Sequence, residues 1–390
     1  MGAGKLSSET PGARETGRPG PACVVWELTL ACNLKCLHCG SSAGGARGAE
    51  LSTGEALALC EDLKRSGARG VALMGGEPQL RRDFWEIAAH ARAQGLELSV
   101  ITNGTVSGED TFSRLNALSP RAVAVSVDAA DPALHDRIRG APGACAKAWE
   151  FIEQALAAGL PVSVITTVHK LNLGELAALR EKLKGRGIAW QVQTAGAEGA
   201  RFPRELLLTP EEFYSVGIFV ESCRRNFTPE ELPAIGAHDL GYNPALLSSV
   251  SLYEKWEGCQ AGVSVAGVRS DGAVLGCLAL NDERFVEGNV RERPFSEIWR
   301  DPAAFGRFRS FRAADAGPNC AGCAELEKCR GGCSEMSLMK TGALHNDPYC
   351  FKRLEPELFP GGSGCLPGGP ARGSLFRRLG RIFGGRGGRG

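Results

Sequence analysis

The chain lacks any apolar run that is long and uncharged enough to span a bilayer. Residues 1–22, which are rich in glycine, proline, serine and charged side chains, also lack the apolar core of an export signal. These two absences argue against a membrane-spanning or exported protein. We therefore predict a cytoplasmic one.

An excess of charge of one sign is missing too. The 45 lysines and arginines are balanced by 44 aspartates and glutamates, which leaves a formal net charge of +1. Such a chain has no overall field that would hold a polyanion. We therefore predict that it does not bind nucleic acid.

Cysteine, by contrast, is abundant, with 15 in 390 residues. A reducing cytoplasm does not favour disulfides, and an odd number cannot pair completely. Clustered thiols in such a chain are more often metal ligands or catalytic groups. The spacing of the cysteines therefore carries the functional information.

Short β-branched runs alternate with helical stretches from about Cys23 to Val192, which is the pattern of βα units around a parallel sheet. Six such runs occur, at residues 24–30, 71–74, 98–102, 122–127, 162–168 and 188–193. They predict an α/β fold, a partial (β/α)6 TIM-like barrel. In such a barrel the reactive groups lie on loops at the carboxyl ends of the strands.

Helix starts are readable at three places. Ser52 with Glu55 predicts a capping box, Asn172 with Glu175 predicts another, and Thr209 begins a further helix. The predicted divisions are a disordered lead at 1–22, the barrel at 23–200, a helix and bridge at 201–255, a smaller cysteine-rich domain at 256–358 and a Gly/Arg-rich tail at 359–390. A basic amphipathic helix that touches a membrane is an alternative for the tail, but a disordered tail is the prediction.

Directly after the first predicted strand come Cys32, Cys36 and Cys39 in a C-x3-C-x2-C spacing. Chance would place this spacing in a chain of such composition only about 0.02 times. Three thiolates on one loop can hold three irons of a [4Fe–4S] cube and leave the fourth open to a small molecule. Zinc is the alternative, but its only local fourth ligand is His38, which we expect to pack or stack.

The strand, these cysteines and Gly75-Gly76-Glu77-Pro78 after the second strand together resemble the radical S-adenosylmethionine (SAM) superfamily. The resemblance covers roughly residues 24–200. It implies that the cysteines bind a [4Fe–4S] cluster and that SAM chelates its open iron. It also implies reductive cleavage of SAM to a 5′-deoxyadenosyl radical, which abstracts hydrogen from a substrate.

The same resemblance implies a set of residues around SAM. The glycine turn would meet the SAM ammonium, Glu77 would add charge or brace that turn, and polar residues at the ends of the third and fourth strands would contact ribose and carboxylate. The predicted residues are Gly75, Gly76, Glu77, Pro78, Asn103, Ser126, Asp128 and His38. His135, Asp136 and Arg139 match another recurrent stretch, but Asp136 and Arg139 fit an i,i+3 pair, so we leave them outside the site.

A second group of cysteines has a spacing that resembles the SPASM extension of radical SAM proteins. The resemblance implies one auxiliary [4Fe–4S] cluster at Cys320, Cys323, Cys329 and Cys350, and another at Cys259, Cys277 and Cys333. Residues 260–265 contain no cysteine, so the latter cluster has three thiolates and a corner left for water, another side chain or substrate. Zinc ribbons are the alternative. Cys23, Cys60, Cys145, Cys223 and Cys365 remain unassigned, and Cys60 is expected in the core.

The resemblance predicts an enzyme with SAM and three [4Fe–4S] clusters that modifies a peptide, for example by a thioether or carbon–carbon crosslink in a ribosomally made precursor. Formylglycine formation is disfavoured because Leu278 stands where those family members carry an Asp. The expected partners are the peptide and a reductant such as flavodoxin or ferredoxin. Residues 1–22 are too few for a leader-binding module, so a leader would be recognised by the barrel, by the bridge at 227–255 or by a separate leader-binding protein. Two alternatives remain: a tetrapyrrole or haem-precursor enzyme using Arg201, Arg204, His238 or Tyr242, and a non-catalytic Fe–S electron carrier or zinc scaffold.

Overall fold

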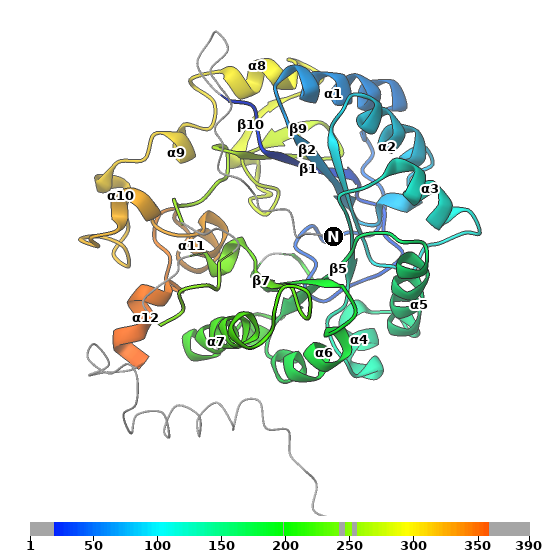
Figure 1. The fold of residues 1–390 in the computed structure, drawn as a ribbon. Coiled ribbons are helices and arrows are strands. Elements are labelled where there is room, and N and C mark those ends of the chain that lie inside the picture. Colours follow the sequence, from blue (N-terminus) through cyan, green and yellow to red (C-terminus); the bar gives the residue numbers. More distant parts are fainter. Residues whose placement is uncertain (1–18, 198, 242–245, 252–255, 359–390) are drawn as a thin grey trace, which may run out of the picture.

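The computed structural model describes residues 19–197, 199–241, 246–251 and 256–358. The predicted tail, Tyr242, Cys365 and most of the predicted lead lie outside the described residues. One ten-stranded sheet, with the order β10-β9-β8-β1-β2-β3-β4-β5-β6-β7, forms the centre of the molecule (Figure 1). Among the described residues, no helix combines the length and the apolar character needed to cross a membrane.

The six predicted strands are confirmed, and each pairs in parallel with the next. They are β1 (Cys23–Thr29), β2 (Gly70–Gly75), β3 (Glu97–Thr102), β4 (Ala122–Ser126), β5 (Val162–Val168) and β6 (Ala189–Thr194). Parallel strands in register bring all their carboxyl ends to one edge of the sheet, where the predicted site residues follow. The partial barrel expected from the sequence is therefore present.

Four short strands extend this sheet beyond the prediction. They are β7 (Ala234–Gly236), β8 (Val265–Val268), β9 (Ala273–Leu275) and β10 (Val286–Asn289). β7 pairs in parallel with β6 and β8 in parallel with β1, while β9 and β10 continue antiparallel. The sheet thus runs without a break from the barrel into the second cysteine region.

Helices cover the outer face of the curved sheet (Figure 1). They are α1 (Thr53–Arg65), α2 (Phe84–Ala93), α3 (Thr111–Leu118), α4 (Pro132–Arg139), α5 (Ala144–Ala157), α6 (Leu176–Leu183) and α7 (Pro210–Asn226). The second cysteine region adds α8 (Phe295–Arg300), α9 (Gly306–Arg309), α10 (Leu326–Cys329), α11 (Ser334–Thr341) and α12 (Phe351–Leu358). Short 3₁₀ helices lie at Pro78–Leu80, Leu173–Glu175, Arg204–Leu206, His238–Leu240, Glu283–Phe285 and Ala313–Asp315.

The capping box at Ser52 is confirmed, because its side chain and that of Glu55 each accept the other residue's backbone N–H. Thr209 begins α7 with the same arrangement. The second predicted box is wrong. The Asn172 side chain accepts the His169 N–H and donates to a carbonyl of β5. The Glu175 carboxylate accepts the N–H groups of residues 130 and 131.

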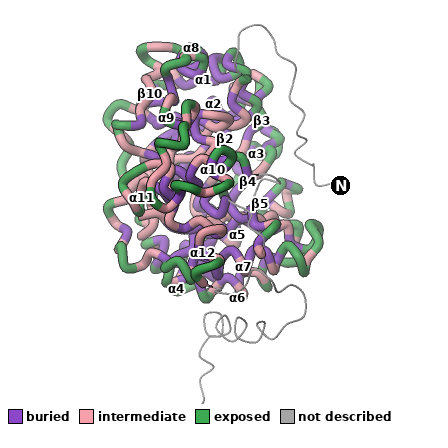
Figure 2. Tube along the Cα trace, turned by 90° about the vertical axis from the view of Figure 1, so that its left-hand side faces the viewer, coloured by how far each residue is buried: buried purple, intermediate pink, exposed green. Residues whose placement is uncertain are grey.

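The core lies between the sheet and these helices. Val24, Trp26 and Leu28 alternate along β1 and are fully buried, and Trp190 plays the same part in β6. Burial of a large apolar side chain contributes about 1.5–3 kcal/mol, so these positions anchor the strands. Buried residues run through the interior of the molecule, and exposed residues lie along its outer surfaces (Figure 2). Cys60 is buried in α1, as predicted.

Candidate functional site

The first cysteine loop leaves the carboxyl end of β1. Its base is closed by Cys32, whose N–H donates to the Gly44 carbonyl (2.8 Å), and by the Gly44 N–H, which donates to the Leu30 carbonyl (3.1 Å). Cys36 and Cys39 follow within the loop, and all three cysteines are partly buried free thiols. The strand end thus presents three sulfur ligands from one short segment.

Two of these sulfurs receive backbone N–H groups. The Leu34 N–H lies 3.4 Å from Cys32 Sγ, and the Ala43 N–H lies 3.3 Å from Cys39 Sγ. The Asn103 side-chain amide is 4.0 Å from Cys32 Sγ, which places this predicted residue beside the loop. Burial raises the pKa of Cys32 to about 11. Because a metal binds the thiolate, loading of this site releases protons and weakens as pH falls.

Cys36 has a different donor, the Arg139 guanidinium, at 3.8 Å from its sulfur. Burial raises the pKa of Cys36, and the charge of Arg139 opposes that rise. Sequence reasoning left Arg139 outside the site, and the expected pair with Asp136 does not form. Asp136 instead accepts the backbone N–H groups of residues 143 and 145.

Arg139 pairs with Asp128, a fully buried carboxylate, at 2.8 Å. His38 Nε2 is 3.5 Å from the same carboxylate, and the Thr167 N–H donates to its other oxygen (3.0 Å). Burial raises the pKa of Asp128, but the charge of Arg139 is the main opposing cause and the pKa lies below its usual value. Burial lowers the pKa of His38 to about 4, so His38 is neutral at pH 7. Asp128 therefore faces the underside of the cysteine loop.

The cysteine loop also rests on the end of α4. The Lys35 N–H donates to the Arg139 carbonyl (3.2 Å) and the Leu37 N–H to the Ile138 carbonyl (2.9 Å). Gly140 follows with a positive φ of 70°, and a Cβ there would lie 2.6 Å from the Lys35 carbonyl oxygen. The helix end therefore fixes the middle of the loop.

The glycine turn after β2 packs on the same loop. The Gly76 N–H donates to the Thr29 carbonyl and the Glu77 N–H to the Ala31 carbonyl, both at 2.8 Å. A Cβ on Gly75 would collide with the Thr29 carbonyl, and one on Gly76 with that of Ala31. Glycine is therefore required at both positions because the turn lies directly against the backbone at the end of β1.

Glu77 braces this turn. Its buried carboxylate accepts the Thr102 hydroxyl (3.0 Å), the Asn103 N–H (2.8 Å) and the Gln79 N–H (3.3 Å). Burial raises the pKa of Glu77 to about 7, and these hydrogen bonds limit the rise. The sequence left open whether Glu77 adds charge to the site or braces the turn, and these hydrogen bonds correspond to the bracing role. Pro78 starts the next 3₁₀ helix, and Ser126 ends β4 at the same sheet edge.

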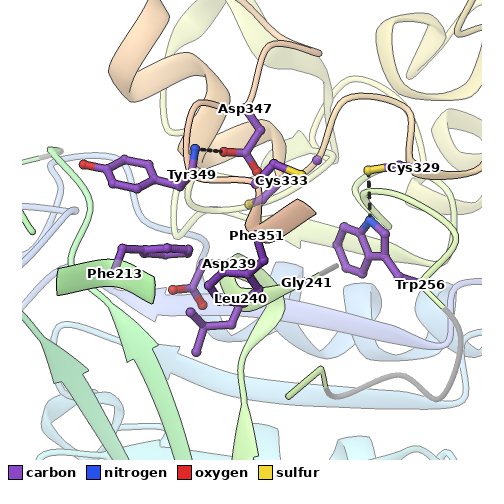
Figure 3. Close-up of a pocket in the computed structure, with 12 residues that line it drawn as sticks. Phe213, Asp239, Leu240, Gly241, Trp256, Cys329, Cys333, Asp347, Tyr349 and Phe351 are labelled. Atoms are coloured by element: carbon purple, nitrogen blue, oxygen red, sulfur yellow. Dashed lines mark hydrogen bonds between the residues drawn. The ribbon is translucent and has the colours of Figure 1, made fainter. Parts of the chain in front are cut away.

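In the second cysteine region, the four cysteines predicted to form one set lie around α10 and the start of α12. Burial raises the pKa of Cys320 to about 11 and that of Cys350 to about 12, and the charge of Cys329 contributes to both shifts. The Trp256 indole N–H donates to Cys329 Sγ at 3.3 Å (Figure 3). A small cavity of about 10 Å³ lies here, lined by Cys329, Cys333 and Cys350 among others.

The other predicted set also comes together. Burial raises the pKa of Cys277 to about 12, with the charges of Glu335 and Cys259 adding to the rise. Burial raises the pKa of Cys333 as well, and again Cys259 and Glu335 contribute. His238 Nε2 lies 3.1 Å from Glu335 Oε2 beside these thiols. Sequence reasoning did not connect Glu335 with this site.

The segment after β6 contacts both cysteine regions. The Ala200 N–H donates to Ser42 Oγ (2.8 Å), and the Arg201 guanidinium donates to the Cys36 carbonyl (3.1 Å). The Ala197 N–H lies 3.0 Å from Met339 Sδ on α11. Arg201 also donates to the carbonyls of residues 42 and 43, so it holds the first loop in place.

The donors fit iron–sulfur clusters. Each described cysteine is a free thiol, and soft thiolates grouped in threes and fours are the ligands that such clusters prefer. N–H groups directed at the sulfurs stabilise the thiolate form and tune a bound cluster. The first loop offers three thiols. His38 is the histidine within this cysteine motif, and its Nε2 faces Asp128.

Comparison with protein families gives two matches. Residues 26–183 match the radical SAM superfamily, and residues 259–324 match SPASM, an iron–sulfur cluster-binding domain. An AdoMet-dependent heme synthase of Methanosarcina barkeri (strain Fusaro / DSM 804) is 30% identical, over 85% of this chain and 97% of that protein. Mycofactocin maturase MftC of Mycobacterium ulcerans (strain Agy99) is 31% identical, over 87% of this chain and 90% of that protein.

Solved structures show the same fold. SuiB of Streptococcus suis bound to S-adenosylmethionine superposes with a TM-score of 0.70 at 18% identity, covering 85% of this chain and 77% of that one. Native anSMEcpe with bound AdoMet and Kp18Cys peptide gives a TM-score of 0.66 at 18% identity, covering 87% of this chain and 97% of that one.

Proposed function

The chain belongs to the radical SAM superfamily and carries a SPASM domain, and from this premise we infer that it cleaves SAM reductively and modifies a peptide substrate. It is an enzyme, with SAM and iron–sulfur clusters as cofactors, so the non-catalytic carrier and the zinc scaffold are set aside. When bound, the reduced cluster and SAM supply a carbon-centred radical that removes a hydrogen atom from the substrate.

The observation that carries this proposal is the three-thiol loop at the end of β1. Cys32, Cys36 and Cys39 would hold the cluster, and the Asn103 amide lies 4.0 Å from Cys32 Sγ. Glu77 fixes the ends of β2 and β3 around the loop, while Arg139 holds a positive charge beside Cys36. The remaining predicted contacts, Ser126 and the glycine turn, line the same strand ends, where SAM would be oriented.

Anaerobic reconstitution tests the reaction. With dithionite and SAM, the protein should release 5′-deoxyadenosine, and Cys32→Ala, Cys36→Ala or Cys39→Ala should each reduce the release to background. Release that persists in these variants would refute the assignment of the loop.

We further propose three [4Fe–4S] clusters, one at the first loop and two at the SPASM cysteines. Full loading then corresponds to about twelve iron and twelve sulfide ions per chain. We also propose that flavodoxin or ferredoxin supplies the electrons and that the enzyme works in the cytoplasm with these carriers. A separate protein binds the leader of the precursor peptide. Pull-down of a precursor peptide with and without such a partner tests the last point.

The peptide substrate is supported by the maturases among the curated relatives. The second candidate is a tetrapyrrole, supported by the heme synthase and by an Fe-coproporphyrin III synthase of the same strain, 31% identical over 85% of this chain and 88% of that protein. One structural feature favours a substrate with carboxylates. Lys170, Arg204 and Lys340 are exposed residues, and partial burial of the Lys340 amine together with the charges of Lys170 and Arg204 lowers its pKa.

An anaerobic assay separates the two candidates. The protein is incubated with SAM and either an iron-porphyrin precursor or a precursor peptide encoded beside the gene. Mass spectrometry then reports which one loses hydrogen or carboxyl groups. Modification of the peptide alone supports the first candidate, and modification of the porphyrin alone supports the second.

A further inference from the structure

The cysteine set of Cys259, Cys277 and Cys333 provides only three thiols for a four-iron cluster. The part of the chain that the structure describes brings two more donors to these thiols, His238 and Glu335. One ligand atom from each of these two residues and the sulfur of Cys333 all lie within 4.8 Å of one another. Glu335 is in the first turn of α11, two residues after Cys333.

The negative charge of Glu335 interacts with two of the three thiols. It contributes, after burial, to the raised pKa of both Cys277 and Cys333. His238 is coupled to the remaining thiol, Cys259. Together with the short distances to Cys333, these interactions place Glu335 and His238 beside the cysteine set.

The hydrogen bond between the two side chains restricts the imidazole more than the carboxylate. His238 Nε2 is 3.1 Å from Glu335 Oε2, and a carboxylate oxygen accepts hydrogen bonds, so in this contact Nε2 carries a hydrogen and only Nδ1 has a lone pair to offer, whereas both carboxylate oxygens keep lone pairs. The other carboxylate oxygen, Oε1, faces Gly196, where a Cβ would lie 3.1 Å away. The side chain of Glu335 is also the less exposed of the two, at 18% against 45% for His238.

We propose that Glu335 supplies the fourth ligand of the auxiliary cluster at Cys259, Cys277 and Cys333, and that His238 holds the carboxylate in place. The proposal rests on the auxiliary-cluster assignment of the proposed function. A protein carboxylate at this corner closes the cluster to exogenous ligands. The cluster then serves as an electron relay, and the substrate does not dock on its iron.

Hyperfine spectroscopy of the auxiliary clusters tests the assignment. The full chain carrying Cys32→Ala, Cys36→Ala and Cys39→Ala is reconstituted, reduced and mixed with ¹³C-cyanide, which binds an iron with an open coordination position. We expect no ¹³C coupling when Glu335 is present and a clear ¹³C coupling after Glu335→Ala. Equal ¹³C coupling in both proteins would show an open corner and overturn the proposal.

A ¹⁴N coupling typical of an iron-bound imidazole, lost on His238→Ala, would also overturn it, because the ligand would then be the histidine. If Glu335→Ala loses the cluster, iron should fall by about four ions per chain and Glu335→Cys should restore it. Failure of Glu335→Cys to restore iron would contradict the proposal. The exposed Glu327→Ala is the matched control and should change neither the iron content nor the spectrum.

Failure of the underlying cluster assignment has a separate signature. Cys277→Ala would then leave the iron content unchanged, whereas a correct cluster with a wrong fourth ligand would still lose iron in Cys277→Ala. Release of 5′-deoxyadenosine by the unmodified protein reports the first site and does not depend on either result.

Discussion

The two cysteine regions are built in different ways. Cys32, Cys36 and Cys39 lie on one loop, and their neighbours Asn103 and Arg139 are polar side chains of the barrel. The cysteines of residues 259–350 come from distant segments that β8, β9 and β10 attach to the barrel sheet. Their surroundings include buried aromatic side chains of Phe213, Trp256 and Tyr349 (Figure 3).

This difference separates two tasks. A site that binds a small molecule at a cluster needs few protein ligands and polar groups around them, and the first loop and the strand ends offer three thiols with Asn103 beside them. A site that only relays electrons is better enclosed, because burial and hydrogen bonds to sulfur tune its potential. Breaking each region should therefore have different consequences.

The largest expected effect comes from removing one ligand in each region. Cys39→Ala should lower 5′-deoxyadenosine release by at least about 1000-fold, because the cluster that binds SAM is lost. Cys350→Ala should preserve that release within a few-fold while losing substrate modification. Cys60→Ala, in the core, should retain both. Loss of SAM cleavage in Cys350→Ala would erase the proposed division of tasks.

The buried ion pair under the first loop should give the next largest effect. Arg139→Met leaves the Asp128 charge buried and uncompensated, which should destabilise the protein by about 3–5 kcal/mol in chemical unfolding. The double variant Asp128→Leu/Arg139→Met should recover most of that loss. Arg121→Met breaks an exposed pair with Glu97 and should cost no more than about 1 kcal/mol. Equal losses in Arg139→Met and Arg121→Met would show that the buried pair has no special role.

Glu77 should make stability depend on pH. Its pKa rises from 4.5 to about 7 on folding, so the folded state holds the proton more tightly. The resulting stability is complete below pH 4.5 and is lost as pH rises through 7, a change of about 3 kcal/mol. Glu77→Gln should flatten this slope in unfolding experiments, and exposed Glu86→Gln should not. An unchanged slope in Glu77→Gln would contradict the burial of an ionisable brace.

The smallest expected effect distinguishes the strain of a positive φ angle from a steric contact with the cysteine loop, just after α4. Gly140 and Gly143 both have positive φ angles, of 70° and 78°, so alanine should cost about 1 kcal/mol at either position. A Cβ at Gly140 would press on the Lys35 carbonyl, whereas one at Gly143 meets nothing within 4 Å. Only Gly140→Ala should also lower the iron content of the first site. Equal iron content in the two variants would mean that the helix end does not fix the loop.

The sequence was informative where the signal was local. Strand periodicity located β1 to β6, and cysteine spacing singled out the first loop, because each of these signals occupies one short segment. The division of the later cysteines into two sets came from the resemblance to SPASM proteins. Prediction from the sequence failed where groups distant in the chain compete for the same side chain. Arg139 fits a local pair with Asp136, yet the buried carboxylate of Asp128 attracts it instead. Asn172 and Glu175 likewise satisfy tertiary partners rather than a helix start.

Strands of three or four residues, such as β7 and β9, carry too little periodicity to be recognised from the sequence. The contact between His238 and Glu335 joins residues 97 positions apart and has no sequence motif. Such features depend on how the chain closes the sheet, which the pattern of residues alone does not reveal.

The central claim is that the iron left open by Cys32, Cys36 and Cys39 binds SAM directly. Electron-nuclear double resonance of the reduced protein, with SAM labelled by ¹⁵N at its amino group, measures this contact. We predict a ¹⁵N coupling to the cluster that disappears in Cys32→Ala. A spectrum without ¹⁵N coupling, although equilibrium dialysis shows SAM to be bound, would contradict the claim.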